Sequence, residues 1–257
     1  MVSSHSQRGF SLVEVSVVIL IMGLLLGGLM MPLSMQRENA RLREAAEKLA
    51  SVQEAVQGFA LVNGALPCPA TPGSDGLASP SGGGCTVQHG FVPATTLGLN
   101  GRRNDDNLLL DAWGSPIRYS VTASDADADG RWDFVTVGEM RNVSMPLLAP
   151  DLVICSTSAG SSATSCSGTS ETLSQDAAAV IYSLGRDWAS FGSADQLENV
   201  GTTLGGGASG ATYRVASDRV FVDQGRSDLA GSEFDDLLLW IPPVKLYARL
   251  VETGHLP

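Results

Sequence analysis

The segment "RGFSLVEVSVVILIMGLLLGGLMM" (residues 8–31) decides the N-terminal half of the fold. Beyond Arg8 it carries a single formal charge, Glu14, in the 22 residues from Phe10 to Met31. At about 1.5 Å per residue, a helix of this length measures roughly 33 Å, which is enough to cross the hydrocarbon core of a bilayer. The composition therefore predicts a transmembrane helix over residues 10–31.

A secretory signal peptide is the alternative, and it fits this segment less well. The apolar core of a signal peptide has about 7–15 residues and ends at a small-residue cleavage site. Here the apolar run is longer, and "PLSMQ" (32–36) follows it without such a site. Arg8 favours a cytoplasmic position for the first nine residues, whereas Arg37, Arg41 and Arg43 beyond the segment weaken this charge asymmetry.

Glu14 is the unexpected residue of the segment. An ionised acid at the centre of a membrane costs about 2.5–3.5 kcal/mol on insertion scales, and less near an interface. Glu14 follows Phe10 by only about 6 Å along the helix axis, so its carboxylate could reach the headgroups. Two interpretations stay open: Glu14 is a tolerated interfacial acid, or it has a cationic partner within the membrane.

The stretch "GFSLVE" (9–14), followed at once by the apolar run, resembles the class III leader junction of type IV prepilins and type II secretion pseudopilins. The resemblance implies that prepilin peptidase cuts after Gly9 and that Phe10 becomes the N-methylated first residue. It also implies that Glu14 neutralises the terminal amine of a neighbouring subunit. An amine and a carboxylate that share a low-dielectric site each reduce the burial penalty of the other.

Residues 32–63 predict an amphipathic continuation of the same helix. Apolar residues recur there at steps of three and four: Leu42, Ala45, Leu49, Val52, Val56 and Phe59. We expect Pro32 to kink the helix rather than end it, and Gly64 with Pro67 to end it. The second half of the helix should then pack on a soluble domain, as the resemblance to pilins also implies.

Residues 64–257 predict a β-rich globular domain that begins with a long Gly/Pro-rich connection, residues 64–104. The β-like runs beyond it are Ile117–Thr122, Phe134–Val137, Leu152–Cys155, Val180–Leu184, Tyr213–Val222 and Leu237–Ile241. Residues 156–170 and 201–210 read as flexible loops, and a short helix is expected over Val244–Glu252. The expected fold class is α+β and pilin-like, with a long N-terminal helix packed on an antiparallel β-sheet.

Two further stretches resemble this family locally. "DAWGSPIRY" (111–119) is similar to a turn that leads into a sheet strand of major pseudopilins, and "FDDLLLW" (234–240) is similar to the C-terminal end of minor pilin-like proteins. On their own residues the first stretch is a turn in which Trp113 packs. We therefore expect structural roles for both.

The four cysteines form two pairs that are close in sequence: Cys68 with Cys85, and Cys155 with Cys166. Such pairs in Gly/Ser/Pro-rich loops are typical of disulfides that close loops, whereas a zinc site would more often show CxxC pairs with histidine. Disulfides require an oxidising compartment, so most of the chain should be exported. The formal net charge of −11 repels duplex DNA and anionic membrane surfaces, and no nucleic-acid partner is expected.

The stretch "DADADGRWD" (125–133) predicts a calcium site. It places Asp125, Asp127 and Asp129 at positions 1, 3 and 5 of an EF-like loop, with Gly130 at position 6 and Asp133 at position 9. Position 12 is a threonine instead of the bidentate glutamate, so Glu139 or a more distant acid would have to complete the shell. The alternative is an acidic Asp-Gly hairpin turn without a metal.

No catalytic constellation stands out. His89 is the only histidine placed to act as a base, and it has no accompanying nucleophile motif, so it reads as an ordinary loop residue. Asp105-Asp106 and Asp235-Asp236 are expected to be solvated acid pairs in turns. "GGGASG" (205–210) lacks the lysine and the strand–helix context of a phosphate-binding loop. We therefore expect a protein that is not an enzyme.

The sequence supports two functions of different classes. In the first, residues 1–9 are a leader, residues 10–31 a membrane and polymerisation helix, residues 32–63 a stalk and residues 64–257 a periplasmic or extracellular domain of a minor pilin or pseudopilin. Its partners would be other pilin-type subunits, prepilin peptidase and the inner membrane. In the second, the chain is a membrane-anchored periplasmic binding domain that does not polymerise.

Overall fold

The computed structural model describes residues 10–256, and for residues 26–34 it describes the backbone alone. Helix α1 spans Leu12–Asn63, 52 residues, and continues through Pro32. Ser11 caps its first turn, because the Oγ of Ser11 accepts from the backbone N–H of Val13 at 3.3 Å. The helix ends where Gly64 adopts a φ of 68°, a conformation that glycine allows. The expected single long helix is confirmed.

The chain divides into two compact units, one up to Arg43 and the other from Glu44 onward. The first unit holds the N-terminal part of α1, and the second holds the end of α1 and all other elements. Among the residues whose side chains are described, no helix combines the length and apolar character that a membrane crossing needs. The expected membrane segment, residues 10–31, includes side chains from residue 26 onward that lie outside the described residues.

The second unit is built from short strands and helices around the end of α1. Its strands are β1 (Pro80–Ser81), β2 (Gly84–Cys85), β3 (His89–Phe91), β4 (Arg118–Val121), β5 (Leu152–Cys155), β6 (Thr172–Ala177), β7 (Ala179–Ser183), β8 (Thr202–Leu204), β9 (Tyr213–Val215), β10 (Val220–Val222) and β11 (Leu237–Ile241). Its other helices are the 3-10 turn η1 (Pro72–Ser74), α2 (Glu139–Val143), α3 (Ala194–Glu198) and α4 (Pro243–Glu252). The α+β class with antiparallel sheets is confirmed.

The main sheet has the order β11-β7-β4-β3, and each neighbouring pair is antiparallel. Its central strand β7 is buried along all five residues because both faces of the sheet are covered. Ala179 and Ile181 belong to the hydrophobic cluster that includes α1, whereas Val180 and Tyr182 belong to a second cluster on the opposite face. This alternation is the two-residue period of a strand.

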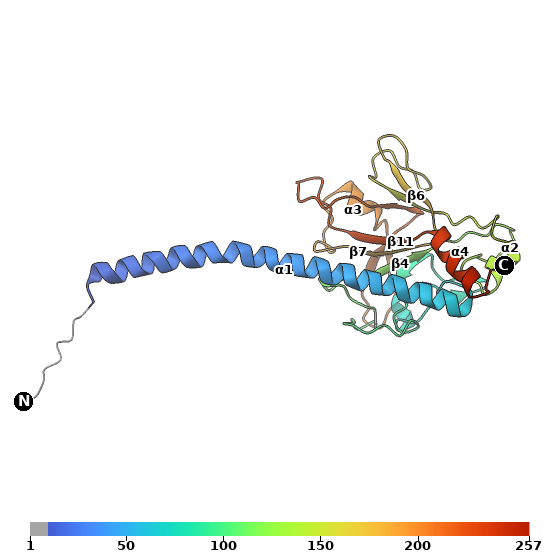
Figure 1. The fold of residues 1–257 in the computed structure, drawn as a ribbon, viewed down its shortest axis with the longest axis horizontal. Helices are drawn as coiled ribbons and strands as arrows, with labels where there is room; N and C mark the ends of the chain where they lie inside the picture. The colour runs from blue at the N-terminus through green and yellow to red at the C-terminus, as the bar shows by residue number, and fades with distance from the viewer. Residues whose placement is uncertain (1–9, 257) are drawn as a thin grey trace, which may run out of the picture. The chain divides into compact units, whose positions relative to one another are not determined.

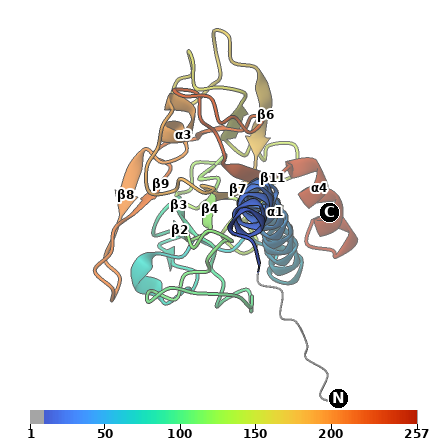
Figure 2. The same ribbon diagram turned by 90° about the vertical axis from the view of Figure 1, so that its left-hand side faces the viewer.

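The end of α1 packs on this sheet, as expected. Leu49, Val52 and Val56 are almost fully buried and share one cluster with residues of β4, β7 and β11. Gln53 adds a polar link, because its Nε2 donates to the carbonyl of Trp240 at 2.8 Å. Figures 1 and 2 show this part of α1 beside the main sheet, with α4 next to both α1 and β11. The apolar stripe predicted from the sequence is thus the core of the second unit.

A second sheet has the order β10-β5-β6 and departs from the expected antiparallel pairing, because β10 runs parallel to β5. The run Tyr213–Val222, expected as one strand, is two strands with different partners. Asp218 interrupts it: its Oδ1 accepts from the backbone N–H of Val220 at 2.9 Å and forms a turn between β9 and β10.

The expected strand Phe134–Val137 is wrong. The segment is a turn in which the N–H groups of Val135 and Thr136 both donate to the carbonyl of Trp132. Phe134 is fully buried in the main core. An apolar residue in the sequence indicates burial, but burial alone does not distinguish a strand from a buried turn. The loop assignment of residues 201–210 is also wrong in part, since β8 pairs there with β9.

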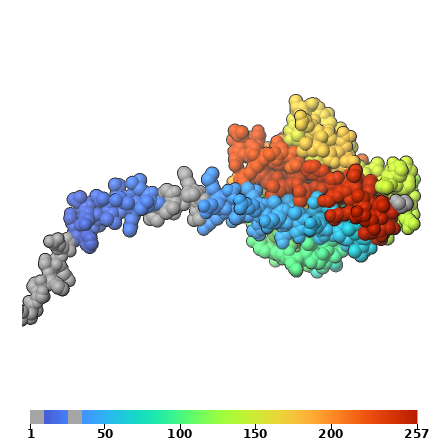
Figure 3. Space-filling model, viewed as in Figure 1, coloured from blue at the N-terminus to red at the C-terminus, as the bar shows by residue number. Residues whose placement is uncertain are grey.

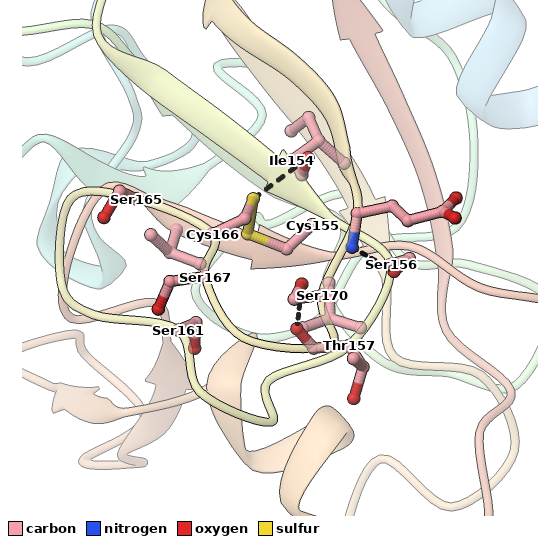
Figure 4. The surroundings of a disulfide bond; sticks show 12 residues. Ile154, Cys155, Ser156, Thr157, Ser161, Ser165, Cys166, Ser167 and Ser170 are labelled. Carbon is pink, nitrogen blue, oxygen red and sulfur yellow. Dashed lines mark hydrogen bonds between the residues drawn. A yellow bond between two sulfur atoms is a disulfide. The ribbon is translucent and has the colours of Figure 1, made fainter.

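Both expected disulfides are present, Cys68–Cys85 and Cys155–Cys166. The first joins β2 to the segment after α1. The second closes the base of the Ser/Thr-rich loop that leads from β5 to β6, a segment that stands out from the surface as a lobe in Figure 3. Figure 4 shows how Ser170 Oγ donates to the carbonyl of Thr157 across this loop, at 2.7 Å.

Candidate functional site

The first candidate site is the N-terminal part of α1. Twelve large apolar side chains between Phe10 and Leu25 have at least 46 % of their surface exposed, and Phe10 has 82 %. They occupy successive positions, so the helix is apolar on every side. Gly9, the expected cleavage residue, lies outside the described residues. Phe10, the expected first residue of the mature chain, is the first residue described.

Glu14 is the only acidic or basic side chain in this exposed apolar segment, residues 10–25. It lies in the first turn of α1, where the partial positive charge of the helix N-terminus favours an acid. Phe10, Glu14 and Val18 share one side of the helix, where they line a shallow hollow with Val15 and Ile19. Within the described part of the chain, no cation lies at ion-pair distance from the Glu14 carboxylate.

The second candidate site is the acidic loop, residues 125–133, which follows β4. Asp125 organises its backbone: Oδ1 accepts from the N–H of Asp129 at 3.1 Å, and Oδ2 accepts from the N–H of Gly130 at 2.9 Å. Ala128 and Gly130 have positive φ angles of 58° and 87°, which turn the chain back on itself. The expected spacing therefore produces a tight loop in which the Asp125 carboxylate binds the backbone of Asp129 and Gly130.

The structure brings the expected metal ligands together. One carboxylate oxygen each from Asp125, Asp127 and Asp133 lies within 4.8 Å of the other two, and Asp127, Asp129 and Glu139 form a second such set. Asp133 is fully buried, and its Oδ2 accepts from the Oγ of Ser124 at 2.8 Å. Burial raises the pKa of the Asp133 carboxyl, and the charges of Asp125 and Asp127 add to the effect.

Glu139 lies at the start of α2 with only 3 % of its side chain exposed. Its Oε1 accepts from the Nη1 of Arg131 at 3.2 Å and from the Nδ2 of Asn142 at 3.1 Å. Position 12 of the loop, Thr136, is used elsewhere, because its Oγ1 donates to the carbonyl of Gly83 at 2.6 Å. Of the acids considered in the sequence, Glu139 is thus the one that joins the loop.

A buried polar network was not expected from the sequence. Asp235 and Asp236, predicted to be solvated, are only 5 % and 4 % exposed, and Asp106 of the other acid pair is 3 % exposed, so that prediction is wrong for these three residues. Asp236 Oδ2 accepts from the Nδ2 of Asn199 at 2.7 Å. Burial, with a smaller contribution from the charge of Asp235, raises the pKa of Asp236 to about 8. Asn199 in turn binds the backbone of β10, so the network ties β11 to the second sheet.

Arg118 is the cation of this network and is 2 % exposed. Its Nε donates to the carbonyl of Arg214 at 2.9 Å, and its Nη1 donates to the Oγ of Ser115 and the carbonyl of Pro116. Burial lowers the pKa of Arg118 to about 10, which keeps it charged at neutral pH. The stretch 111–119 is therefore the expected turn with an added role: it positions a buried cation.

His89 lies in strand β3 and not in a loop, which corrects that expectation. Its Nδ1 is 3.0 Å from the Oγ of Ser120, and burial lowers its pKa to about 4. A neutral imidazole that faces a strand residue fits a structural role. The hydroxyl that His89 contacts belongs to Ser120, which is fully buried in β4.

Comparison with known proteins bears on the first candidate site. Residues 4–30 match the family described as "Prokaryotic N-terminal methylation motif". No curated protein and no solved structure is significantly similar to the chain. The match covers the segment that holds Gly9, Phe10 and Glu14.

Proposed function

Because residues 4–30 carry the N-terminal methylation motif, the class III prepilin leader of type IV pilin and pseudopilin proteins, we propose that this chain is a minor pilin or pseudopilin subunit. It is cleaved after Gly9 by prepilin peptidase, N-methylated at Phe10 and assembled through α1 into a type IV pilus or a type II secretion pseudopilus. Proteins with this motif are pilin-like structural subunits, which agrees with the expectation of a protein that is not an enzyme.

The exposed apolar segment of α1 is the observation that carries the proposal. A helix that is apolar on every side is stable only where its whole surface is removed from water, in a bilayer or within a helical assembly. The side chains of residues 10–25 have this character. A subunit that is first held in the inner membrane and is then assembled into a filament would bury this apolar surface in both places.

Glu14 supports assembly over simple anchoring. A carboxylate weakens membrane insertion, so an anchor has no use for it. Cleavage after Gly9 would create a cationic amine at Phe10, and no cation among the described residues is paired with Glu14. In the proposed filament, the Glu14 carboxylate of one subunit pairs with the amine of a neighbour, where the apolar surroundings strengthen the pair.

The second unit supports an exported location. Its two disulfides need an oxidising compartment such as the periplasm. The proposed topology places the leader in the cytoplasm, residues 10–31 in the inner membrane and the β-rich domain in the periplasm. With 257 residues the chain is larger than a typical major subunit, and we assign it to the minor subunits.

The competing function is a membrane-anchored periplasmic binding domain that does not polymerise. This alternative explains the apolar segment and the disulfides, but it gives no role to Glu14 or to cleavage between Gly9 and Phe10. The two functions differ in what a change at Glu14 should do.

Glu14→Ala tests the proposal. The variant should insert into the membrane as well as the native chain does, or slightly better, while its amount in sheared pili or pseudopili falls at least tenfold. Quantitative immunoblots of the membrane fraction and of the sheared filament fraction measure the two effects separately.

Glu47→Ala is the matched control, because Glu47 is an exposed acid on the same helix outside the apolar segment. It should be incorporated like the native chain. Equal incorporation of Glu14→Ala and Glu47→Ala would refute the amine-pairing role and favour the anchored binding domain.

A further inference from the structure

We infer that the acidic loop binds one Ca²⁺ ion through Asp125, Asp127 and Asp133, and that Asp129 and Glu139 complete its carboxylate shell. This site does not depend on the proposed assembly function, since it lies wholly within the second unit. The inference goes further than the motif does, because it assigns the closing ligand and a competing cation.

The distances between the carboxylates of Asp125, Asp127 and Asp133 fit one hard cation. Calcium is bound by oxygen ligands at about 2.3–2.6 Å, so two ligand atoms on opposite sides of one ion lie about 5 Å apart. The oxygens of Asp125, Asp127 and Asp133 lie within 4.8 Å of one another. Asp127 also belongs to the set with Asp129 and Glu139, so it links these two acids to the first set.

Asp133 provides the independent evidence for a ligand. Its side chain is fully buried, and its Oδ1 has no hydrogen-bond donor among the described residues. A buried carboxylate oxygen without a partner destabilises the fold, because it has lost its hydration and received nothing in exchange. Since Oδ2 is already bonded to Ser124 and to the backbone of Ala126, a cation in the loop would satisfy the remaining oxygen.

Glu139 replaces the glutamate that the loop lacks at position 12. It is three residues farther along the chain, but the turn at residues 133–138 brings it back to Asp127 and Asp129. Its burial and its hydrogen bond from Asn142 hold the carboxylate in place. A preplaced carboxylate loses little side-chain freedom when it binds an ion.

Arg131 is the cation that the loop itself supplies. Its Nη1 lies 3.2 Å from Glu139 Oε1, and its Nε lies 3.9 Å from Asp129 Oδ2. Because the Arg131 side chain is 57 % exposed, its guanidinium can leave the carboxylates for solvent when Ca²⁺ binds. Arg131 should therefore compete with the ion and weaken its binding.

Terbium luminescence tests the site in the full-length protein held in mild detergent and treated with a chelator. Trp132 lies within the loop and serves as the energy donor to bound Tb³⁺. We expect sensitised Tb³⁺ emission, its displacement by Ca²⁺ with a dissociation constant on the order of 10⁻⁴–10⁻³ M, and little displacement by Mg²⁺ at the same concentration.

Four variants separate the roles. Asp125→Asn and Asp133→Asn should weaken Ca²⁺ binding at least tenfold, and Glu139→Gln should weaken it about tenfold. Arg131→Gln should strengthen it several-fold, an effect that a purely structural loop would not show. Asp105→Asn, a change at an exposed acid outside the loop, is the matched control and should bind like the native chain.

Far-UV circular dichroism of each variant establishes that it is folded. Asp133 is buried, so the partly exposed Asp125 keeps the test decisive if Asp133→Asn does not fold. Displacement of Tb³⁺ by Mg²⁺ as strong as by Ca²⁺, or unchanged Ca²⁺ binding in Asp125→Asn, would overturn the site. Unchanged binding in both Glu139→Gln and Arg131→Gln would overturn the assigned closing ligand and competitor.

Discussion

Replacing Asp236 with asparagine should remove most of the pH dependence of stability between pH 6.5 and 8. Asp236 is 4 % exposed, and burial raises its pKa to about 8. In the unfolded chain the same carboxyl ionises near its ordinary value of 3.8. Above that value the folded protein keeps a proton that the unfolded chain releases, so the free energy of unfolding falls as the pH rises towards 8.

The size of the effect follows from the pKa. One retained proton changes the free energy of unfolding by about 1.4 kcal/mol per pH unit. Between pH 6.5 and 8, with Asp236 itself beginning to ionise, the native chain should lose about 2 kcal/mol. Asp235, whose pKa is raised mainly by burial, acts in the same direction. Burial lowers the pKa of His89 to about 4 from 6.5, so its titration changes the stability mainly between these two values, below this window.

Urea unfolding of the full chain in mild detergent, followed by tryptophan fluorescence, measures the effect. Asp236→Asn keeps the oxygen that Asn199 binds and replaces the unpartnered Oδ1 with an amide group that carries no charge. The variant should keep only the part of the pH slope that comes from Asp235, whereas the exposed-site control Asp105→Asn should keep the whole slope. A native chain equally stable at pH 6.5 and 8, or an unchanged slope in Asp236→Asn, would refute the reasoning.

Two further predictions concern the core and the disulfides. Leu49→Ala should lower the free energy of unfolding by about 2–5 kcal/mol, because Leu49 is 2 % exposed in the main core. Val62→Ala, at a residue of the same helix that is 77 % exposed, should change it by less than about 0.5 kcal/mol, and equal effects in urea unfolding would contradict the assigned face. Replacing both Cys68 and Cys85 with serine should cost about 3 kcal/mol, because the disulfide closes a separation of 17 residues. An unfolding midpoint that does not change in this variant would show that the disulfide does not stabilise the domain.

The elements that the sequence predicts are those in which buried apolar residues form a regular pattern. The stripe through Leu49, Val52 and Val56 has the helical period, and it is the face that packs on the sheet. Strands β5, β7 and β11 appear as continuous apolar runs because the sheet faces around them are covered. By contrast, β6 reads "TLSQDA" and is largely exposed, so its pairing with β5 leaves no apolar pattern to detect.

The buried polar groups were the least predictable part. Asp235 and Asp236 look like solvated acids because their partners are far away in the sequence: Asn199 is 37 residues from Asp236, and Arg118 comes from a different strand. Burial of a carboxyl is decided by such distant contacts. The acidic loop was more predictable, because the alternation of Asp125, Asp127 and Asp129 is local. Only the folded turn after Asp133 shows which later acid joins them.

Mass spectrometry of the mature N-terminus, on protein isolated from its native cells, tests the central claim most directly. The account predicts a chain that begins at Phe10 with a methylated amine. Because Arg8 leaves with the leader, the formal side-chain net charge would change from −11 to −12. A chain that keeps Met1, or one cut at any other position, would contradict assembly through a prepilin-type N-terminus.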